Sequence, residues 1–251
     1  MSAIIEVQNL VKKYGDFTAV NGISFSIENG ETFGILGPNG AGKTTTLEMI
    51  EGLKKPTSGR IILDGKDVER ETNAVKSIIG VQLQASTFFE GLNLVELIEV
   101  FAALYNRIVD PMQLLEEVQL TDKAKNQVKE LSGGQKQRFS IAVGLVNDPK
   151  VLFLDEPTTG LDPQARRHLW DLVKAIKAKG KTVVLTTHYM DEAEVLCDRI
   201  AIMDAGKIIA FDTPGKLIEN LLASGFSKPA IVQQANLEDV FLNLTGHQLR
   251  E

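Results

Sequence analysis

The sequence predicts an α/β fold with a mainly parallel sheet, an N-terminal antiparallel β layer and a helical insert. Strand and helix patterns alternate after Gly37, and this alternation is typical of parallel sheets that bind ligands at their carboxyl edge. The runs Val151–Leu154 and Lys181–Thr187 have the composition of buried parallel strands. These observations predict one α/β core.

The composition sets limits on the class of protein. The chain has 251 residues, of which 43% are hydrophobic, and this excludes a disordered chain. A net charge of −6 argues against a dedicated nucleic-acid binder, because contacts to phosphates need a basic face. The single Cys197 can form neither an internal disulfide nor a metal cluster, so we expect the protein to lie in a reducing cytoplasm. Cys197 itself is expected to be a small hydrophobic residue of the core. No apolar run approaches the roughly 20 residues that cross a bilayer, and the first residues lack signal-peptide features.

Residues 4–36 are predicted to form the antiparallel layer. Short β-rich runs alternate there with turn signals such as Glu28-Asn29-Gly30, and Ile23–Ile27 alternates strictly between apolar and polar residues. The run Thr57–Leu63, followed by the turn Asp64-Gly65, is predicted to complete the same layer.

A glycine loop lies between the predicted strand Thr32–Leu36 and a predicted helix at Thr45–Ile50. Such a loop turns backbone N–H groups and the helix N-terminus toward phosphate oxygens, as in the phosphate loop of a P-loop NTPase core. Lys43 would reach the β- and γ-phosphates, and the Thr44 hydroxyl would bind Mg²⁺. Thr45 would add an α-phosphate contact. The alternative is a glycine-rich turn without a ligand. The loop comprises Gly37, Pro38, Asn39, Gly40, Ala41, Gly42, Lys43, Thr44 and Thr45.

Residues 87–131 are predicted to form the helical insert, after a buried strand at Ser77–Leu83 that ends at Gln84. Asp110-Pro111 supplies a cap and a first-turn proline for one of its helices. Ser132-Gly133-Gly134-Gln135 then opens a further helix, whose N-terminus is a second anion-binding end. Apolar residues at helical spacing support the insert: Leu94, Leu97, Ile98, Phe101, Tyr105, Leu114, Leu115 and Val118.

Two carboxylates follow the predicted strand Val151–Leu154. Burying both Asp155 and Glu156 without a cation would be costly. A Mg²⁺ ion held through water by Asp155 would supply the charge and leave Glu156 free to act as a base. The alternative is a strand that ends in acidic loop residues.

Tyr14 and His188 have weak signals when each is taken alone. Tyr14 lies in a predicted loop where its ring could stack on a base, although such a tyrosine is more often a packing residue. His188 follows the strand Lys181–Thr187, a position that is usually incidental.

The last third of the chain contains further elements. Asp162-Pro163 caps a predicted helix, and Arg199–Asp204 with Lys207–Asp212 has the pattern of a hairpin. We predict a domain at 1–222, with a helical subdomain at about 87–147, and a short tail at 223–251. The chain after Asp212 carries two predicted helices, and the second lies in the tail. Its apolar stripe would pack on its own domain or, less simply, on a partner: Leu237, Val240, Phe241 and Leu244.

These motifs resemble, in order and approximate spacing, those of the ATP-binding cassette (ABC) ATPases, the motor subunits of ABC transporters. The resemblance covers nearly the whole chain and implies the ABC ATPase fold. It rests on Gly37–Thr45, Gln84, Leu131–Gln135, Val151–Pro157, Gly160–Asp162 and His188.

The resemblance implies roles for the residues around the γ-phosphate. Gln84 matches the glutamine that contacts Mg²⁺ and the attacking water, although Gln82 is a second glutamine nearby. Asp155 resembles the aspartate that supports the metal, and Glu156 the base that polarises water. His188 resembles the histidine that contacts the γ-phosphate.

The resemblance also implies contacts to the nucleotide from two subunits. Tyr14 matches the aromatic residue that stacks on adenine, and Val20 the apolar residue beside it. In this family Ser132–Gln135 contacts the ATP bound to the opposite subunit, and Gly160-Leu161-Asp162 touches across the interface. The implied assembly is a head-to-tail dimer, either homodimer or heterodimer, that encloses two ATP molecules.

The implied function is a Mg²⁺-dependent ATPase subunit that energises a separate transmembrane permease from the inner face of the cell membrane. Thr186–Glu194 and Leu237–Gly246 resemble the multidrug and daunorubicin-type exporter ATPases, whose cargo is drug-like or other small molecules or lipids. Many such relatives have a longer segment before the tail than Ser227–Ala230, so a dimer contact through the tail is not implied.

Two other functions compete with this one. A soluble ABC ATPase that acts on nucleic acid or ribosomes is disfavoured by the acidic charge and by the absence of coiled-coil arms or a second cassette. A regulatory module without activity is disfavoured because Glu156 and His188 are both present.

Overall fold

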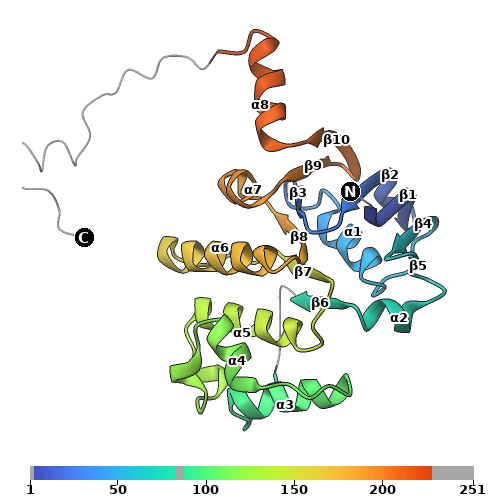
Figure 1. The fold of residues 1–251 in the computed structure, drawn as a ribbon. Coiled ribbons are helices and arrows are strands. Elements are labelled where there is room, and N and C mark those ends of the chain that lie inside the picture. The colour runs from blue at the N-terminus through green and yellow to red at the C-terminus, as the bar shows by residue number, and fades with distance from the viewer. Residues whose placement is uncertain (1–2, 83–87, 228–251) are drawn as a thin grey trace, which may run out of the picture. The chain divides into compact units, whose positions relative to one another are not determined.

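The computed structural model describes residues 3–82 and 88–227 (Figure 1). It divides into two compact units, Met1–Leu217 and Ile218–Glu251. Gln84 and the apolar stripe predicted for the tail lie outside the described residues. The predicted boundary between the domain 1–222 and the tail 223–251 stays a prediction. Within the described ranges, no helix combines the length and the apolar character needed to cross a membrane.

The N-terminal layer is a four-stranded antiparallel sheet in the order β2-β1-β4-β5, which confirms the predicted layer. Its predicted range, residues 4–36, was too long, because Thr32–Leu36 lie in the second sheet and form parallel pairs there. Tyr14 was predicted in a loop, but it is the last residue of β1. The strands stay paired up to Tyr14 and Phe17, so the turn contains only Gly15 and Asp16. The strands are β1 (Ala3–Tyr14), β2 (Phe17–Glu28), β4 (Ser58–Leu63) and β5 (Lys66–Asp67).

The second sheet has six strands in the order β10-β9-β3-β8-β7-β6 and confirms the predicted mainly parallel sheet. Only the β9–β10 hairpin is antiparallel in it. The carboxyl ends of β3, β7 and β8 therefore lie side by side at one edge. The strands are β3 (Thr32–Leu36), β6 (Ile79–Gln82), β7 (Val151–Asp155), β8 (Thr182–Thr187), β9 (Arg199–Asp204) and β10 (Lys207–Asp212).

Helices account for most of the remaining described residues, and the predicted helical insert is present as α3 and α4 (Figure 1). Asp110 caps α4 as expected, by accepting a hydrogen bond from Met112 N–H at 2.9 Å. Tyr105, predicted on the apolar face, is exposed because α3 ends one residue before it. The helices are α1 (Lys43–Ile50), α2 (Thr72–Lys76), α3 (Leu94–Leu104), α4 (Pro111–Glu117), α5 (Gly133–Leu145), α6 (Pro163–Ala178), α7 (Met190–Leu196) and α8 (Pro214–Ala223), with 3₁₀ turns at Thr121–Lys123 and Val128–Glu130.

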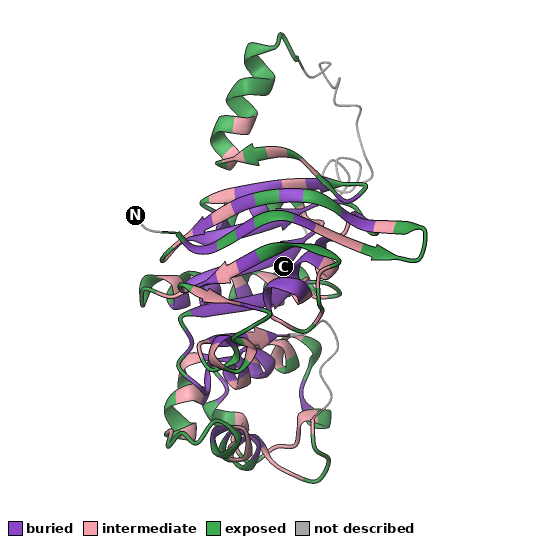
Figure 2. Cartoon of the chain, turned by 90° about the vertical axis from the view of Figure 1, so that its right-hand side faces the viewer, coloured by how far each residue is buried: buried purple, intermediate pink, exposed green. Residues whose placement is uncertain are grey.

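The central parallel strands β3, β7 and β8 are buried at every residue (Figure 2). Along β7, Leu152 and Leu154 belong to a core shared with the helices, whereas Val151 and Phe153 belong to a core shared with the antiparallel layer. This alternation explains why the run is continuously apolar, since a strand with two buried faces has no polar side. The predicted buried Cys197 is a free thiol in the first of these cores.

Helix α5 lies against β6 through a backbone contact between two glycines. A Cβ atom on Gly80 would lie 2.0 Å from the carbonyl oxygen of Gly144, and one on Gly144 would lie 3.3 Å from the Leu152 side chain. Asn147 strengthens the contact by donating to the carbonyl of Ile79 at 2.8 Å. The position of α5, the helix that Ser132 opens, therefore depends on the absence of side chains at this crossing.

We predict that Gly80→Ala lowers the free energy of unfolding by about 1–3 kcal/mol, because the added methyl group overpacks a rigid backbone contact. Urea unfolding measures the effect. Gly215→Ala is the matched control, because a Cβ there meets no atom within 4 Å. Equal urea midpoints for the Gly80 variant and the wild type would contradict the prediction.

Candidate functional site

A cavity of about 590 Å³ lies at the edge where the parallel strands end. It brings together the glycine loop, the end of β7 and the tip of the β1–β2 hairpin. Its lining residues are Tyr14, Phe17, Ala19, Asn39, Gly40, Gly42, Lys43, Thr44, Thr45, Glu156, Thr159 and His188. Tyr14, His188 and Glu156, which are far apart in the sequence, thus meet the glycine loop in one place.

The glycine loop has the shape that the sequence predicts for phosphate binding. Gly42 has a φ of 100° and precedes α1, and because glycine has no side chain, the first N–H groups of the helix lack a side-chain cap. A Cβ on Gly42 would lie 2.5 Å from the Ala19 carbonyl oxygen, and one on Gly37 would lie 2.3 Å from the Met203 carbonyl oxygen. The loop can therefore pack closely while its N–H groups remain suited to an anion.

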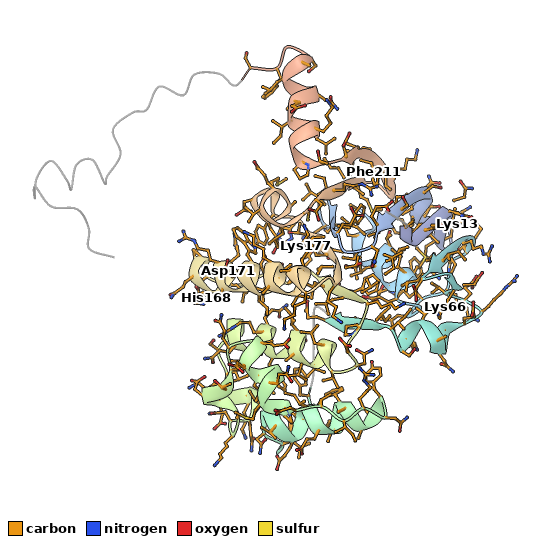
Figure 3. All side chains as sticks on the ribbon, in the orientation of Figure 1. Lys13, Lys66, His168, Asp171, Lys177 and Phe211 are labelled. Atoms are coloured by element: carbon orange, nitrogen blue, oxygen red, sulfur yellow. The ribbon has the colours of Figure 1, made fainter. Side chains whose placement is uncertain are left out.

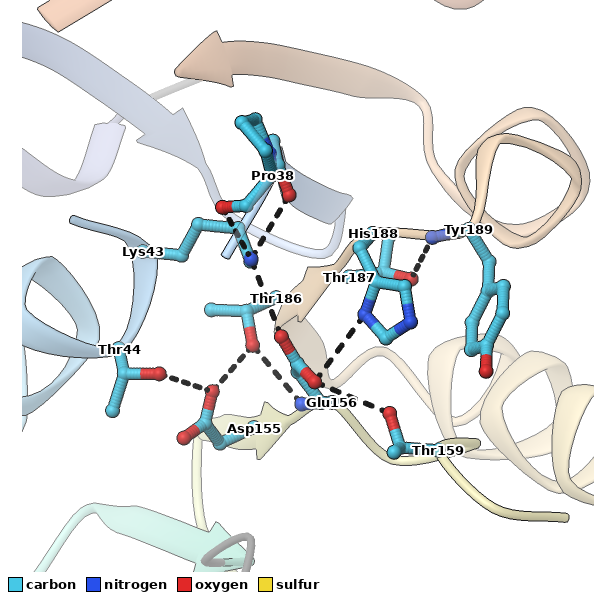
Figure 4. A network of polar contacts seen from close by, with 11 residues as sticks. Pro38, Lys43, Thr44, Asp155, Glu156, Thr159, Thr186, Thr187, His188 and Tyr189 are labelled. Carbon is cyan, nitrogen blue, oxygen red and sulfur yellow. Dashed lines mark hydrogen bonds and ion pairs between the residues drawn. The ribbon is translucent and has the colours of Figure 1, made fainter. Parts of the chain in front are cut away.

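Lys43 is buried and makes three polar contacts (Figure 4). Its Nζ donates to the carbonyls of Gly37 at 2.9 Å and Pro38 at 3.2 Å. It also forms an ion pair with Glu156 Oε1 at 3.2 Å. Sequence reasoning assigned Lys43 to phosphate but missed this ion pair, which supplies a positive charge for one of the two adjacent carboxylates.

Asp155 is buried at the end of β7 and accepts two hydroxyl hydrogen bonds on one oxygen. Thr44 Oγ1 donates to Asp155 Oδ1 at 3.2 Å, and Thr186 Oγ1 donates to the same oxygen. Burial raises the pKa of Asp155 above its usual value despite these hydrogen bonds. Thr44 and Asp155 thus present neighbouring oxygen donors, which is the donor type that Mg²⁺ prefers.

Glu156 has an unusual backbone conformation, with a φ of 47°. Its N–H donates to the carbonyl oxygen of Thr186 at 3.2 Å and to the hydroxyl of the same residue at 3.0 Å. These bonds to β8 hold the residue in the left-handed region and turn it away from the strand direction of β7.

The Glu156 carboxylate is surrounded by donors (Figure 4). His188 Nδ1 lies 3.3 Å from Oε2, and Thr159 Oγ1 donates to Oε2 at 3.2 Å. Burial raises the pKa of Glu156, but the hydrogen bond and charge of Lys43, together with His188, lower it below its usual value overall. The carboxylate is therefore ionised and can accept a proton.

The structure places two aromatic side chains at the mouth of the cavity. Tyr14 is 46% exposed, and Lys12 Nζ lies 5.2 Å from its ring centre. Phe17, its cross-strand partner, is also exposed and lines the cavity. Sequence reasoning missed Phe17, although its place directly after the turn could have indicated it. Val20 is fully buried beneath Gly42 and is not among the lining residues.

Ser132, Gly134 and Gln135 lie in a different pocket of about 160 Å³. Ser132 and Gln135 form a capping box, with Gln135 N–H donating to Ser132 Oγ at 3.3 Å and Ser132 N–H donating to Gln135 Oε1 at 2.9 Å. Asp162 lines the same pocket and caps α6 through a hydrogen bond from Ala165 N–H at 2.8 Å. The predicted nucleotide contacts of Ser132–Gln135 and Asp162 therefore do not lie at the glycine loop of the same chain. The other lining residues are Arg138, Gln164, Ala165 and His168, the last of which Figure 3 shows on α6.

Comparisons with known proteins identify the family of the chain. Residues 20–159 match the family model described as ABC transporter. The chain is 38% identical to the Nod factor export ATP-binding protein I of Burkholderia orbicola (strain AU 1054), and the alignment covers 99% of both chains. That alignment runs over 301 positions, so the relative has residues for which this 251-residue chain has none.

Solved structures show the same fold. An ATP-binding cassette of an ABC transporter is 27% identical, with a TM-score of 0.79 over 89% of this chain and 96% of its own. A dimeric bacterial ABC transporter cassette is 28% identical, with a TM-score of 0.75 over 84% of this chain and 98% of its own.

One further acidic residue lies beneath the site. Glu51 follows the last residue of α1 and is only 1% exposed, and neither carboxylate oxygen has a hydrogen-bond partner among the described residues. Burial, with the nearby charges of Asp155 and Glu48, raises the pKa of Glu51 to about 8. Sequence reasoning did not single out Glu51, because the sequence around it reads as the end of an ordinary helix.

The raised pKa of Glu51 predicts a pH-dependent stability. The Glu51 carboxyl keeps its proton up to about pH 8 in the folded state, whereas the unfolded state releases it near pH 4.5. The contribution of Glu51 to the free energy of unfolding is therefore fully present below pH 4.5 and is lost as the pH rises to about 8. The loss should approach about 1.4 kcal/mol per pH unit for one proton.

Glu51→Gln should remove this dependence, because the amide does not ionise. Urea unfolding between pH 5.5 and 8.5 measures the difference between variant and wild type, which should grow with pH in favour of the variant. Exposed Glu99→Gln is the control. A constant difference over this range would show that Glu51 does not titrate there.

Proposed function

Because this chain belongs to the ABC transporter family of ATP-binding cassettes, we propose that it hydrolyses ATP and thereby energises a separate transmembrane permease. The proposed complex is an exporter of drug-like or other small molecules or lipids, of the multidrug and daunorubicin type. The observation that carries the proposal is the ionised Glu156 carboxylate beside an uncapped helix N-terminus and the buried Lys43.

Glu156 is the proposed general base. Its carboxylate would accept the proton of the water that attacks the γ-phosphate, and His188 and Thr159 hold it in place from the side of Oε2. Lys43 holds the same carboxylate through Oε1. When ATP enters, its phosphate oxygens compete for Lys43 Nζ, which would release Oε1 toward the water.

The residues at the end of β7 fit a Mg²⁺ ion. Thr44 Oγ1 and Asp155 provide the oxygen donors, and Gln84 is the third proposed contact, outside the described residues. Bound there, Mg²⁺ would neutralise part of the negative charge of the phosphates. Tyr14 is proposed to stack on adenine, and the buried Val20 to support the loop rather than to touch the base.

A head-to-tail dimer is the proposed hydrolytic unit. Ser132, Gly134, Gln135 and Asp162 line a pocket separate from the cavity of the glycine loop, so a second subunit would supply the missing contacts. The dimeric cassette among the similar structures supports this arrangement. The second subunit is either another copy of this chain or a different cassette.

The helical insert offers a docking surface for the permease. A cavity of about 510 Å³ there is lined by aromatic and basic side chains, and Phe89 in it is 58% exposed. The lining ring of Phe88 packs against Phe101 and Phe139, and that of Phe89 packs against Phe101. Relatives named Nod factor export ATP-binding protein I support the direction of transport, and the proposed place of this chain is the inner face of the membrane. The lining residues include Phe88, Phe89, Glu90, Leu92, Val128, Lys129 and Lys136.

We predict that Glu156→Gln slows ATP hydrolysis by about 10²–10⁴-fold, the range expected for loss of a general base. Phosphate release measures turnover, and ATP binding should persist because the amide keeps the shape of the site. If the turnover of the variant lay within a fewfold of the wild-type value, Glu156 would not be the general base.

The Glu156→Gln variant should also elute as a dimer with ATP, since closure without hydrolysis is not reversed. Adding Ser132→Arg should abolish this dimer, because the larger side chain fills the pocket at the N-terminus of α5. ATP binding to the monomer should stay unchanged. A dimer that forms equally well in the double variant would contradict the proposed interface.

Purification from membrane extracts tests the permease. The tagged chain should recover a membrane protein with about six apolar segments of spanning length, and Phe89→Glu should lose it while basal hydrolysis persists. Ile209→Glu, at an equally exposed position on β10, is the control. Recovery of nucleic acid or ribosomes without a membrane protein would instead indicate the alternative function.

A further inference from the structure

The side chain next to His188 connects this histidine to helix α6. The ring of Tyr189 lies 4.1 Å from the imidazole, centre to centre, with an angle of 38° between the rings (Figure 4). The Tyr189 N–H donates to Thr187 Oγ1 at 2.9 Å, which fixes the backbone between the end of β8 and the start of α7. The histidine is therefore held between the Glu156 carboxylate and an aromatic ring.

Arg166 packs against the same ring. Its guanidinium carbon lies 4.4 Å from the Tyr189 ring centre, within the range of a cation–π contact. Its Nη1 also lies 3.4 Å from Asp191 Oδ2, on the first turn of α7. Contacts with Tyr189 and Asp191 thus fix the direction of a long side chain that is mostly buried.

Arg166 belongs to the first turn of α6, where the second pocket begins. Its N–H donates to the carbonyl of the capping residue Asp162 at 3.0 Å. The neighbouring Ala165 packs on the start of α5, since a Cβ on Gly134 would lie 2.8 Å from the Cβ of Ala165. A short column of contacts, which passes through the backbone of α6 between Ala165 and Arg166, thus runs from the pocket of Ser132 and Asp162 to the imidazole of His188.

We propose that Arg166 and Tyr189 are positioning residues for His188, which hold its imidazole against Glu156 and tie it to the N-terminus of α6. The proposal rests on the proposed ATPase function and deepens it. Neither side chain needs to touch ATP. They act by restricting the ring of His188. A shift of α6, the helix that faces the second subunit in the proposed dimer, would therefore change the distance between His188 and the Glu156 carboxylate.

The ring of Tyr189, rather than its hydroxyl, carries the effect. We expect Tyr189→Ala to lower the kcat of ATP hydrolysis by about 10- to 100-fold, the size expected when a reacting group is misplaced by about 1 Å. The KM for ATP should change little. Tyr189→Phe should restore the wild-type rate, and Arg166→Gln should reproduce part of the loss.

Arg167→Gln is the matched control, because Arg167 is the next residue of α6 and its side chain is exposed. It should leave kcat unchanged. A double-mutant cycle separates positioning from general damage. In a His188→Ala background, Tyr189→Ala should cause no further loss, because there is no imidazole left to hold.

A second measurement does not need hydrolysis. The chain has three histidines, so the His188 ring resonance can be assigned by comparison with His188→Ala. The resonance should shift in Tyr189→Ala and also in Arg166→Gln, but not in Arg167→Gln. An unchanged resonance in Arg166→Gln would overturn the proposal, as would equal loss of kcat by Tyr189→Ala with and without His188.

Failure of the proposed function has a different signature. If Glu156→Gln hydrolyses ATP as fast as the wild type, the assignment of the base fails, and the resonance shifts alone decide whether the column positions His188. If Glu156→Gln loses turnover while Tyr189→Ala keeps it, the inference fails and the proposed function stands.

Discussion

The ion pair between Lys43 and Glu156 is the interaction on which the site depends. Strand β7 ends in two adjacent carboxylates at a buried edge, and their mutual repulsion needs compensation. The two carboxylates lie in different environments. Asp155 receives hydroxyl hydrogen bonds and has a raised pKa, whereas Glu156 receives a lysine charge and has a lowered pKa. The two acids at the end of this strand thus have different environments, which fit their proposed roles as an oxygen ligand and a base.

The backbone makes this separation possible. Asp155 continues the strand, but Glu156 adopts a left-handed conformation that its bonds to Thr186 maintain. In an extended strand, two neighbouring side chains would point to opposite faces of the sheet. The turn at Glu156 instead directs its carboxylate to the cavity that contains Lys43 and His188. Strain at one residue therefore places the base, which is a common feature of functional sites.

Much of the fold and the site could be predicted from the sequence, because their signals are local. Continuous apolar runs identified the parallel strands, and the caps at Asp110, Ser132 and Asp162 identified helix starts. The missed features depend on contacts between distant segments. The Lys43–Glu156 pair and the buried Glu51 arise only when α1 packs beneath β7, and Tyr14 stays in its strand because pairing with β2 continues further than the turn residues indicate.

The two proposed anion-binding helix ends differ in a way that fits the proposal that each subunit supplies only half of each site. At α1, the residue before the helix is glycine, so the first N–H groups have no side chain to satisfy them and favour a phosphate within the same chain. At α5, Ser132 and Gln135 cap each other, so that end is stable before any ligand arrives. In the proposed dimer the start of α5 contacts the nucleotide of another subunit, so this helix end must be ordered before that nucleotide arrives. The column from Ala165 through Arg166 to Tyr189 then gives that surface a physical connection to His188.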